Sequence, residues 1–352
     1  MIKPQNGFIL FMTFAMLSIC TVMVSMFFIK GMEHKRFSSA LLAQEEMINF
    51  AVSTVSIGQS ALAISVKELK PEKEDDTSEP APSLAQLVLE KIMPILNKTQ
   101  KLYFQEIESN FPAEISLSFF CESGKINLNS LYDLVQNKFY DEGVAEKDKK
   151  VFATWLFGKI AKITEKPSLL QPFIEHVKQR KLPFNDVTEL LSIKEFAACF
   201  LDTVFYSPDL NTEIKDEKVK KIFLTDIFTV ASETQNMQPR LLSTSVCALL
   251  DIELKNNKQE IKGKKVDLSS FKPDNDWKKD WDSQLKPLYG ISYEQIPESV
   301  RSMFAPSFNV TVFSMLATIK NEGISATIFA ILKQKRLPDS SVAYDVIKVY
   351  QV

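Results

Sequence analysis

The chain contains few of the residues on which most enzyme active sites depend. Glycine occurs nine times and histidine twice in 352 residues. Phosphate-binding loops use glycine so that backbone amides can approach the phosphate, and zinc sites and Ser–His or Cys–His catalysis depend on histidine. The sequence also contains no Walker loop, dinucleotide-binding fingerprint or recognisable nucleophile–base pair. These absences favour a protein that is not an enzyme.

Cysteine is scarce as well, with four residues in the chain. Cys20 lies in the first apolar run, and Cys121, Cys199 and Cys247 are too far apart for a local metal motif. An odd number of distant cysteines is typical of buried apolar filling rather than of a disulfide framework. The sequence does not tell whether any of these three forms a disulfide.

Nucleic acid is excluded as a partner on two grounds. The net charge of −2 gives no overall attraction to a polyanion. Residues 182–230 have a pattern similar to helix-hairpin-helix folds, but no glycine lies between Gly158 and Gly263, so the turns that hold a phosphate in such folds are missing.

The most informative feature that is present is a long apolar run, residues 8–29, without a charged residue. As a helix it is long enough to cross a hydrocarbon core of about 30 Å. A signal-peptide cleavage site of small residues is missing after it. Lys30, Lys35 and Arg36 follow the run while only Lys3 and the amino terminus precede it, so the positive-inside rule alone would place the residues after the run in the cytoplasm.

The start of the chain has a short polar leader, then Gly7, then Phe8 and the apolar run. This order resembles the processing signal of type IV pilins and type II secretion pseudopilins, in which a prepilin peptidase cleaves after the glycine and methylates the new N-terminus. The resemblance implies cleavage between Gly7 and Phe8 and an N-methylated Phe8. Pilins usually carry Glu at the fifth mature residue, where this chain has Met12. The minor pseudopilin K of type II secretion (general secretion pathway protein K) characteristically lacks that Glu, so the departure narrows the resemblance to this family.

The pattern after the run predicts how the pilin-like part begins. Apolar residues at helical spacing continue past the run, which predicts one helix over 8–65, partly in the membrane and partly amphipathic. Residues 66–83 are charged and rich in proline, which predicts a loop or disordered insert. Residues 84–131 form the first part of a pilin domain, with a second helix over 84–97 and a strand in which Ile115, Leu117 and Phe119 alternate with serines.

The segment from Gly124 to Asn129, GKINLN, resembles the strand by which pseudopilin K leaves its pilin sheet for an inserted helical domain. Asn127 and Asn129 are otherwise read as ordinary turn or cap residues. Residues 132–250 have apolar residues three and four apart and predict an inserted, all-helical domain, including helices over 131–140, 149–163 and 168–180. The segments 182–205, 224–230 and 246–250 resemble conserved stretches of the same family.

Residues 251–352 are predicted to complete the pilin domain. A helix is expected over 281–304, and strands over 307–317, 324–334 and 343–352 form an antiparallel meander. The meander should pack on the soluble half of the first helix and pair with the strand near residue 115. The fold class is therefore α+β, a long N-terminal helix packed on an antiparallel sheet, with a large all-α domain inserted in the pilin fold.

One candidate metal site stands out. Asp274 and Asp276, with Asp280 and Asp282 nearby, supply carboxylate oxygens suited to Ca²⁺. The K pseudopilins are a calcium-binding family, although their ligands do not align with these residues one by one. The alternative is a solvated acidic loop, since Lys278 and Lys279 lie in the same segment.

The resemblance implies a non-catalytic minor pseudopilin at the tip of the type II secretion pseudopilus, which helps to initiate pseudopilus assembly and protein secretion across the outer membrane. It implies a single-pass inner-membrane protein with most of the chain in the periplasm. The partners implied are other minor pseudopilins through the N-terminal helix, the prepilin peptidase, the inner-membrane secretion platform and membrane lipid. The alternative is a single-pass, inner-membrane-anchored scaffold of an envelope complex without pilin processing. A third reading, a membrane-tethered hydrolase, has no positive signal.

Overall fold

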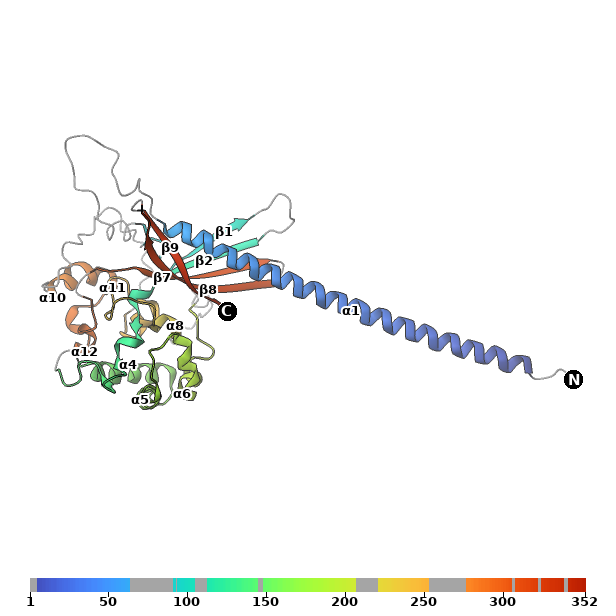
Figure 1. Cartoon of the computed structure of the whole chain (residues 1–352), viewed down its shortest axis with the longest axis horizontal. Coiled ribbons are helices and arrows are strands. Elements are labelled where there is room, and N and C mark those ends of the chain that lie inside the picture. Colours follow the sequence, from blue (N-terminus) through green and yellow to red (C-terminus); the bar gives the residue numbers. More distant parts are fainter. Residues whose placement is uncertain are drawn as a thin grey trace, which may run out of the picture.

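A computed structural model describes residues 5–63, 91–92, 94–104, 113–144, 148–206, 221–252, 277–305, 308–321, 324–338 and 341–352. Its dominant element is one long helix, α1 (Gln5–Leu62), which projects far beyond a globular body (Figure 1). The expected helix over 8–65 is confirmed. Its apolar part has a mean hydropathy of 2.1 over the best window, and none of that window is buried by the rest of the chain. By length and composition this helix can cross a membrane.

The body contains a five-stranded antiparallel sheet in the order β1-β2-β7-β8-β9. Its strands are β1 (Thr99–Phe104), β2 (Ala113–Cys121), β7 (Val312–Asn321), β8 (Ile324–Arg336) and β9 (Val342–Gln351). The C-terminal meander was predicted within a few residues, and β2 pairs with β7 as expected, from Glu114 opposite Lys320 to Cys121 opposite Phe313. β1, which lies at an edge of the sheet, was not predicted.

The last turns of α1 cover one face of this sheet. Met47, Ala51 and Val55 on α1 are buried in one apolar cluster with alternate residues of β2, β7 and β8. Gly58 allows the closest approach, because a Cβ there would lie 2.1 Å from the sulfur of Met315 on β7. The helix-on-sheet arrangement expected from the sequence is therefore present, and it uses only the residues of α1 from about Met47 onward.

Between β2 and β7 the chain forms a mainly helical unit. Its α-helices are α4 (Lys149–Thr164), α5 (Leu170–Gln179), α6 (Lys194–Phe200), α8 (Leu224–Ile227), α9 (Thr244–Leu249), α10 (Trp277–Asp280), α11 (Lys286–Tyr289) and α12 (Glu298–Arg301). Its single turns are the 3-10 helices η1 (Glu122–Gly124), η2 (Leu128–Ser130), η3 (Val187–Ser192) and η6 (Tyr293–Gln295), and the π-turn η5 (Trp281–Leu285). Its short strands are β3 (Ile126–Asn127), β4 (Tyr132–Asp133), β5 (Lys138–Phe139) and β6 (Phe228–Thr229).

The helix expected over 131–140 is wrong, because this segment is the β4–β5 hairpin. The Asp133 side chain accepts hydrogen bonds from the backbone amides of Val135 and Gln136, at 2.8 and 3.0 Å, which closes a turn instead of a helix. Asn137 then adopts a left-handed conformation, with φ of 55°. The apolar spacing that suggested a helix instead brings Tyr132 against Phe139 across the hairpin, with ring centroids 5.2 Å apart.

The single helix expected over 281–304 is also wrong. The chain forms a series of short helices there, interrupted by Gly290 at φ of 70° and by Pro297, which precedes α12. These helices share one buried cluster with residues of α4, α5, α6 and α9, and the indole of Trp281 stacks between Tyr289 and Phe304. The helical unit therefore runs past residue 250 and includes residues up to about Phe304.

Two expectations lie outside the described residues. The charged loop over 66–83 is one, and most of the helix over 84–97 is the other, of which the structure describes only a helical pair at residues 91–92 and a turn at 94–97.

Gly124 gives a test of how closely the helical unit is joined to the sheet. A Cβ at this position would lie 1.6 Å from the carbonyl oxygen of Leu241, which is a backbone atom and cannot rotate away. We expect Gly124→Ala to lower the free energy of unfolding by about 1–3 kcal/mol or to prevent folding. Urea denaturation followed by tryptophan fluorescence measures the effect.

Gly158 is the matched control, since it lies in α4 with nothing within 4 Å of the added Cβ. Gly158→Ala should leave stability unchanged or raise it by up to about 1 kcal/mol, as expected for alanine in a helix. Equal stability of the two variants would show that the approach of Leu241 to Gly124 is not tight.

Candidate assembly surface and the junctions behind it

The predicted processing site lies at the N-terminal end of α1, and the predicted calcium ligands lie outside the described residues. The backbone of Gly7 and Phe8 is helical and belongs to the first turns of α1. Asp274 and Asp276 lie outside the described residues, so calcium binding there stays a prediction. Of the neighbouring carboxylates, Asp282 accepts a hydrogen bond from the backbone amide of Tyr293 at 3.2 Å. Within the described ranges, no three His, Cys, Asp or Glu side chains gather in a way that could hold a metal ion.

The apolar half of α1 is suited to lipid on all sides. Its side chains are exposed, and the hydroxyls of Ser18, Thr21 and Ser25 each donate to the carbonyl four residues earlier, at 2.8–2.9 Å. These intrahelical hydrogen bonds satisfy the polar groups, so they need no partner in a hydrocarbon environment. This half of α1 can therefore sit in a bilayer alone or against other helices.

Farther along α1, three exposed apolar side chains share one side of the helix. Phe37, Leu41 and Val52 are 63%, 50% and 46% exposed, and at about 100° per residue they lie within a sector of about 60°. Leu42, which is 60% exposed, lies about 100° from Leu41 and outside this sector. Gln59 points in the same direction and donates to the carbonyl of Tyr344 on β9, at 2.6 Å. The apolar sector of α1 therefore faces the β9 side of the sheet.

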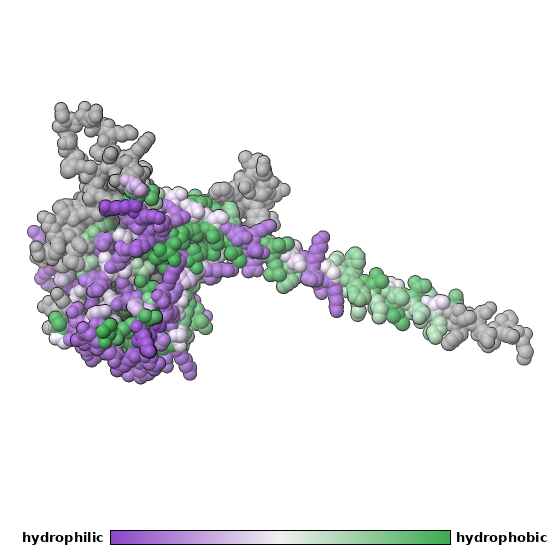
Figure 2. Space-filling model, in the orientation of Figure 1, coloured by the Kyte–Doolittle hydropathy of each residue, from purple (hydrophilic) through white to green (hydrophobic). Residues whose placement is uncertain are grey.

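β9 presents apolar side chains toward the same region. It is an edge strand, and Val346 and Val349 pair with Leu332 and Ala330, which belong to the face of the sheet that α1 covers. Val346 and Val349 are nevertheless 38% and 44% exposed. We refer to Phe37, Leu41, Val52, Val346 and Val349 as the α1–β9 surface. Figure 2 shows hydrophobic side chains gathered on the body beside the point where α1 leaves it.

A buried polar cluster holds the helical unit to the sheet where β2 ends. Glu122 and Lys125 form an ion pair with both side chains almost fully buried. Ser314 on β7 donates to the carboxylate of Glu122 at 2.6 Å, and Thr229 on β6 donates to its other oxygen at 2.5 Å. The carboxylate therefore joins η1, where the chain leaves β2, to the sheet through Ser314 and to the helical unit through Thr229. Because its oxygens are hydrogen-bonded as well as paired, its burial is compensated.

Asp226 on α8 lies behind this cluster and is also buried. Burial raises the pKa of its carboxyl group above the ordinary value, although nearby Lys125 and hydrogen bonds from Ser245 oppose the shift. The Ser245 backbone amide donates to the carboxylate at 2.6 Å, and the Ser243 hydroxyl donates to the Asp226 carbonyl. These contacts fix the start of α9 against α8.

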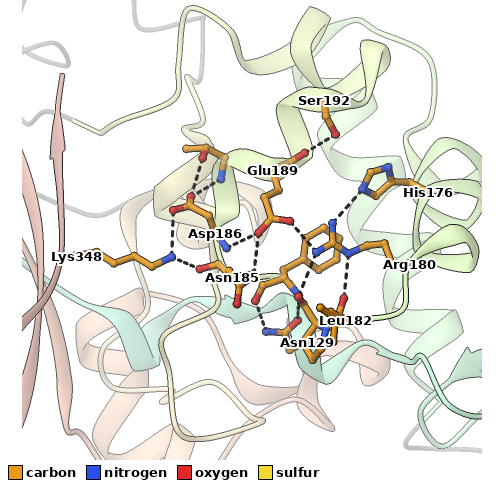
Figure 3. Close-up of polar contacts among 12 residues, drawn as sticks. Asn129, His176, Arg180, Leu182, Asn185, Asp186, Glu189, Ser192 and Lys348 are labelled. Atoms are coloured by element: carbon orange, nitrogen blue, oxygen red, sulfur yellow. Dashed lines mark hydrogen bonds and ion pairs between the residues drawn. The ribbon is translucent and has the colours of Figure 1, made fainter.

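A second junction joins η3 of the helical unit to β9 (Figure 3). The Asp186 carboxylate pairs with Lys348 at 3.1 Å and accepts a hydrogen bond from the hydroxyl of Tyr350. Lys348 also donates to the carbonyl of Asn185. Burial by itself would raise the pKa of Asp186, but the hydrogen bonds from Tyr350, Thr188 and Lys348 outweigh burial and lower it. The carboxylate is therefore charged at neutral pH, and it anchors the edge strand.

The same region of Figure 3 is fixed from the other side by Arg180, Glu189 and Asn129. Arg180 pairs with Glu189 at 2.7 Å and lies over the ring of Phe184, 4.1 Å from its centroid. The Asn129 side chain accepts from the Phe184 amide at 2.8 Å and donates to the Phe184 carbonyl at 2.9 Å. The loop before η3 is thus held to the start of the helical unit.

The sequence leaves open whether Asn127 and Asn129 are turn or cap residues or belong to the strand that leads into the helical unit. In the structure Asn127 caps η2, and both side chains also form hydrogen bonds to residues far along the chain. The Asn127 side chain accepts from the Asn129 amide at 3.0 Å, which caps η2, and donates to the Ser232 carbonyl at 3.0 Å. Glu122, Lys125 and Asp186 were not predicted as junction residues. Only their positions could have suggested it, since Glu122 and Lys125 flank the Gly124 turn and Asp186 is a residue type that caps helices, as it does for η3.

The groups that are most often nucleophiles or bases are in structural roles. Burial raises the pKa of the Cys121 thiol to about 12, so the thiol is neutral at ordinary pH. Burial and the nearby Arg180 guanidinium lower the pKa of His176, and its ring stacks on Phe184 with centroids 6.1 Å apart.

Comparisons with known proteins give distant likenesses among solved structures. No family model matches the chain, and no curated protein matches it. Among solved structures, a chain of the GspK-GspI-GspJ complex from the enterotoxigenic Escherichia coli Type 2 Secretion System matches with a TM-score of 0.43 and 12% identity. The match covers 90% of this chain and 99% of that chain.

The buried ion pair gives a quantitative test of the first junction. Glu122→Gln removes the ion-pair partner of the buried Lys125 ammonium, so we expect a loss of about 3–5 kcal/mol in the free energy of unfolding. The double variant Glu122→Gln/Lys125→Met should recover a large part of that loss, because the buried ammonium is removed together with its partner. Urea denaturation of the single and double variants measures the coupling.

Glu114→Gln is the control, since Glu114 on β2 pairs with Lys101 on β1 at the surface of the sheet, at 2.6 Å. Exposed pairs contribute little, so this variant should unfold at nearly the wild-type urea concentration. A Glu122→Gln variant as stable as Glu114→Gln would contradict the role given to the buried pair.

Proposed function

We propose that this chain is a non-catalytic minor pseudopilin of the K type, positioned at the tip of the type II secretion pseudopilus. The observation that carries the proposal is the arrangement of three parts along the chain. One helix has a bare apolar half and a half that packs on an antiparallel sheet, and a large helical unit interrupts that sheet between β2 and β7. The first two parts are the pilin arrangement, and the third is the insertion that the GKINLN resemblance implies.

The position of the helical unit supports a tip location. Figure 1 shows this unit at the end of the molecule remote from the N-terminus of α1. In a filament built by stacking parallel α1 helices, a unit of this size at that end would occupy the space of the next subunit. A subunit at the tip has no such neighbour. The absence of Glu at the fifth mature position, Met12, agrees with a subunit that has neighbours on one side only.

The α1–β9 surface supports contact with other minor pseudopilins. Phe37, Leu41 and Val52 are exposed to water in the isolated chain, and burying such side chains fully stabilises an interface by roughly 1.5–3 kcal/mol each. Within the bilayer the apolar half of α1 gains little from hydrophobic transfer, since lipid tails are equally apolar. The helices of two smaller minor pseudopilins would therefore gain most of their binding energy on the water-exposed part of α1.

The same geometry is compatible with the second candidate, a single-pass scaffold anchored in the inner membrane and never processed. In both cases the body lies in the periplasm and no chemistry is carried out by the chain. The two candidates differ at Gly7 and Phe8. A prepilin peptidase must reach the bond between these residues, and the helix is weakest there because glycine lowers helix stability by about 1 kcal/mol relative to alanine.

Processing is therefore the first test. We expect co-expression with an active prepilin peptidase to remove the leader up to Gly7 and leave N-methyl-Phe8, as read by mass spectrometry of the N-terminal peptide. Gly7→Ala should be processed much less well, while the neighbouring Asn6→Ala serves as the control and should be processed normally. An intact Met1 on the wild-type chain, in the presence of a peptidase that cleaves a known pseudopilin, would favour the unprocessed scaffold.

Assembly is the second test, through a photo-crosslinking amino acid placed at Phe37, Leu41 or Val52. We expect adducts with two different, smaller pseudopilins at these positions. Val151 is a matched control, because it is 55% exposed on α4 in the helical unit, away from α1, and should give no such adduct. Adducts of the chain with itself in a repeating ladder would mean that it forms the shaft and not the tip.

A further inference from the structure

Directly after the apolar run, α1 carries three cationic side chains within two turns. Lys30, Lys35 and Arg36 are all exposed. At about 1.5 Å per residue they span about 9 Å of the helix axis. The one acidic residue among them is Glu33, so the segment from Lys30 to Arg36 has a net charge of +2 from three cations and one carboxylate. The next acidic residues along the chain are Glu45 and Glu46.

These three cations surround the helix. At about 100° per residue, Lys35 lies about 140° from Lys30, and Arg36 lies about 240° from it. The gaps between neighbouring cations are thus about 140°, 100° and 120°, and Glu33, about 300° from Lys30, lies in the last of these gaps. A helix that presents charge to a protein partner gathers it on one face, whereas these three cations are distributed around the axis. We refer to Lys30, Lys35 and Arg36 as the cationic collar.

The collar has no partner among the described residues, where no ion pair or hydrogen bond of these three side chains is found. The body does not reach it, since the first residue of α1 that the sheet buries is Met47, about 16 Å beyond Arg36 along the axis. Figure 2 shows hydrophilic side chains that project from both sides of the helix between two more hydrophobic stretches. The collar is therefore free to meet whatever lies at the end of the membrane span.

We propose that the cationic collar binds the headgroups of anionic phospholipids in the leaflet that faces the body, and so fixes the depth of α1 in the membrane. This inference rests on the proposed membrane anchoring of residues 8–29. A headgroup layer surrounds the helix on all sides, which matches the distribution of the three cations. Lys and Arg bind phosphate oxygens by charge-assisted hydrogen bonds, and each contributes about 1 kcal/mol near an anionic membrane surface.

Binding of anionic lipid by the collar also gives a reason for cations on the periplasmic side of the span, which the positive-inside rule disfavours. More cations follow the span than precede it, which on charge alone favours the wrong orientation for a periplasmic body. Cations on the periplasmic side of the span that bind anionic lipid would hold α1 at a fixed depth in the membrane. They oppose sinking of the body toward the bilayer and withdrawal of the helix from it until the contacts of a neighbouring subunit replace them.

The test uses the full-length protein in bilayers of phosphatidylcholine with a trace of spin-labelled lipid, either phosphatidylglycerol or phosphatidylcholine. Electron paramagnetic resonance measures the lipid that is immobilised against the protein. We expect phosphatidylglycerol to be preferred about fivefold over phosphatidylcholine, the ratio that corresponds to one charge contact. The preference should fall in 0.5 M salt, and inorganic phosphate at constant ionic strength should not change it, which separates a lipid headgroup from a free anion.

The deciding variant is Lys30→Gln/Lys35→Gln/Arg36→Gln, which should lose most of the preference. Any remainder is expected from Lys3 and the amino terminus on the other side of the span. The matched control is Lys162→Gln/Lys166→Gln/Lys178→Gln, which removes three exposed cations from the helical unit and should keep the wild-type ratio. An unchanged ratio in the collar variant would overturn the proposal, as would a wild-type ratio near 1. Absence of any immobilised lipid would instead refute the membrane anchoring itself.

Discussion

The structure depends on one constraint, namely that the chain leaves the sheet after β2 and returns to it as the adjacent strand β7. Cys121 at the end of β2 pairs with Phe313 near the start of β7, so the whole helical unit begins and ends at one end of the sheet. A unit joined at one end would pivot unless other contacts restrained it. The ion pair of Glu122 and Lys125 closes the exit point, because Ser314 and Thr229 bind the same carboxylate from the sheet and from the helical unit.

The sheet is then covered differently on its two faces. α1 covers one face, and the helical unit covers part of the other, where Phe205 lies 5.2 Å from Phe329 and Tyr206 lies 5.3 Å from Phe120, measured between ring centroids. β9 stays at the edge, held from the far side by Asp186 and open on the side of α1. Val346 and Val349 lie on the α1 face, so their exposure follows from how far α1 covers that face, and they extend the apolar sector of α1 onto the sheet.

The sequence predicts the parts of this fold that have a strong period. The long helix and the three C-terminal strands are continuous patterns, and both are found within a few residues of the expected bounds. The failures lie where local chemistry competes with the pattern. Asp133 closes a hairpin in a segment with helical spacing, Gly290 and Pro297 break a helix, and β1 lies at an exposed edge where Tyr103 is largely in water, so its pattern is weak. The junctions depend on residues far apart in sequence, such as Asp186 and Lys348, and one sequence does not show that they meet.

Position along α1 divides the helix into zones with different surface chemistry. The apolar half satisfies its own hydroxyls, the collar places three cations around the axis with Glu33 in one gap between them, and the α1–β9 surface is an apolar sector beside the edge strand. A headgroup layer surrounds a helix on all sides, whereas an apolar sector suits a few protein neighbours. In the proposed function, the change from lipid contact to subunit contact would therefore fall between Arg36 and Phe37, within a single turn of the helix. The helix from Arg36 to Met47, about 16 Å long, would then separate the buried part of α1 from the headgroups.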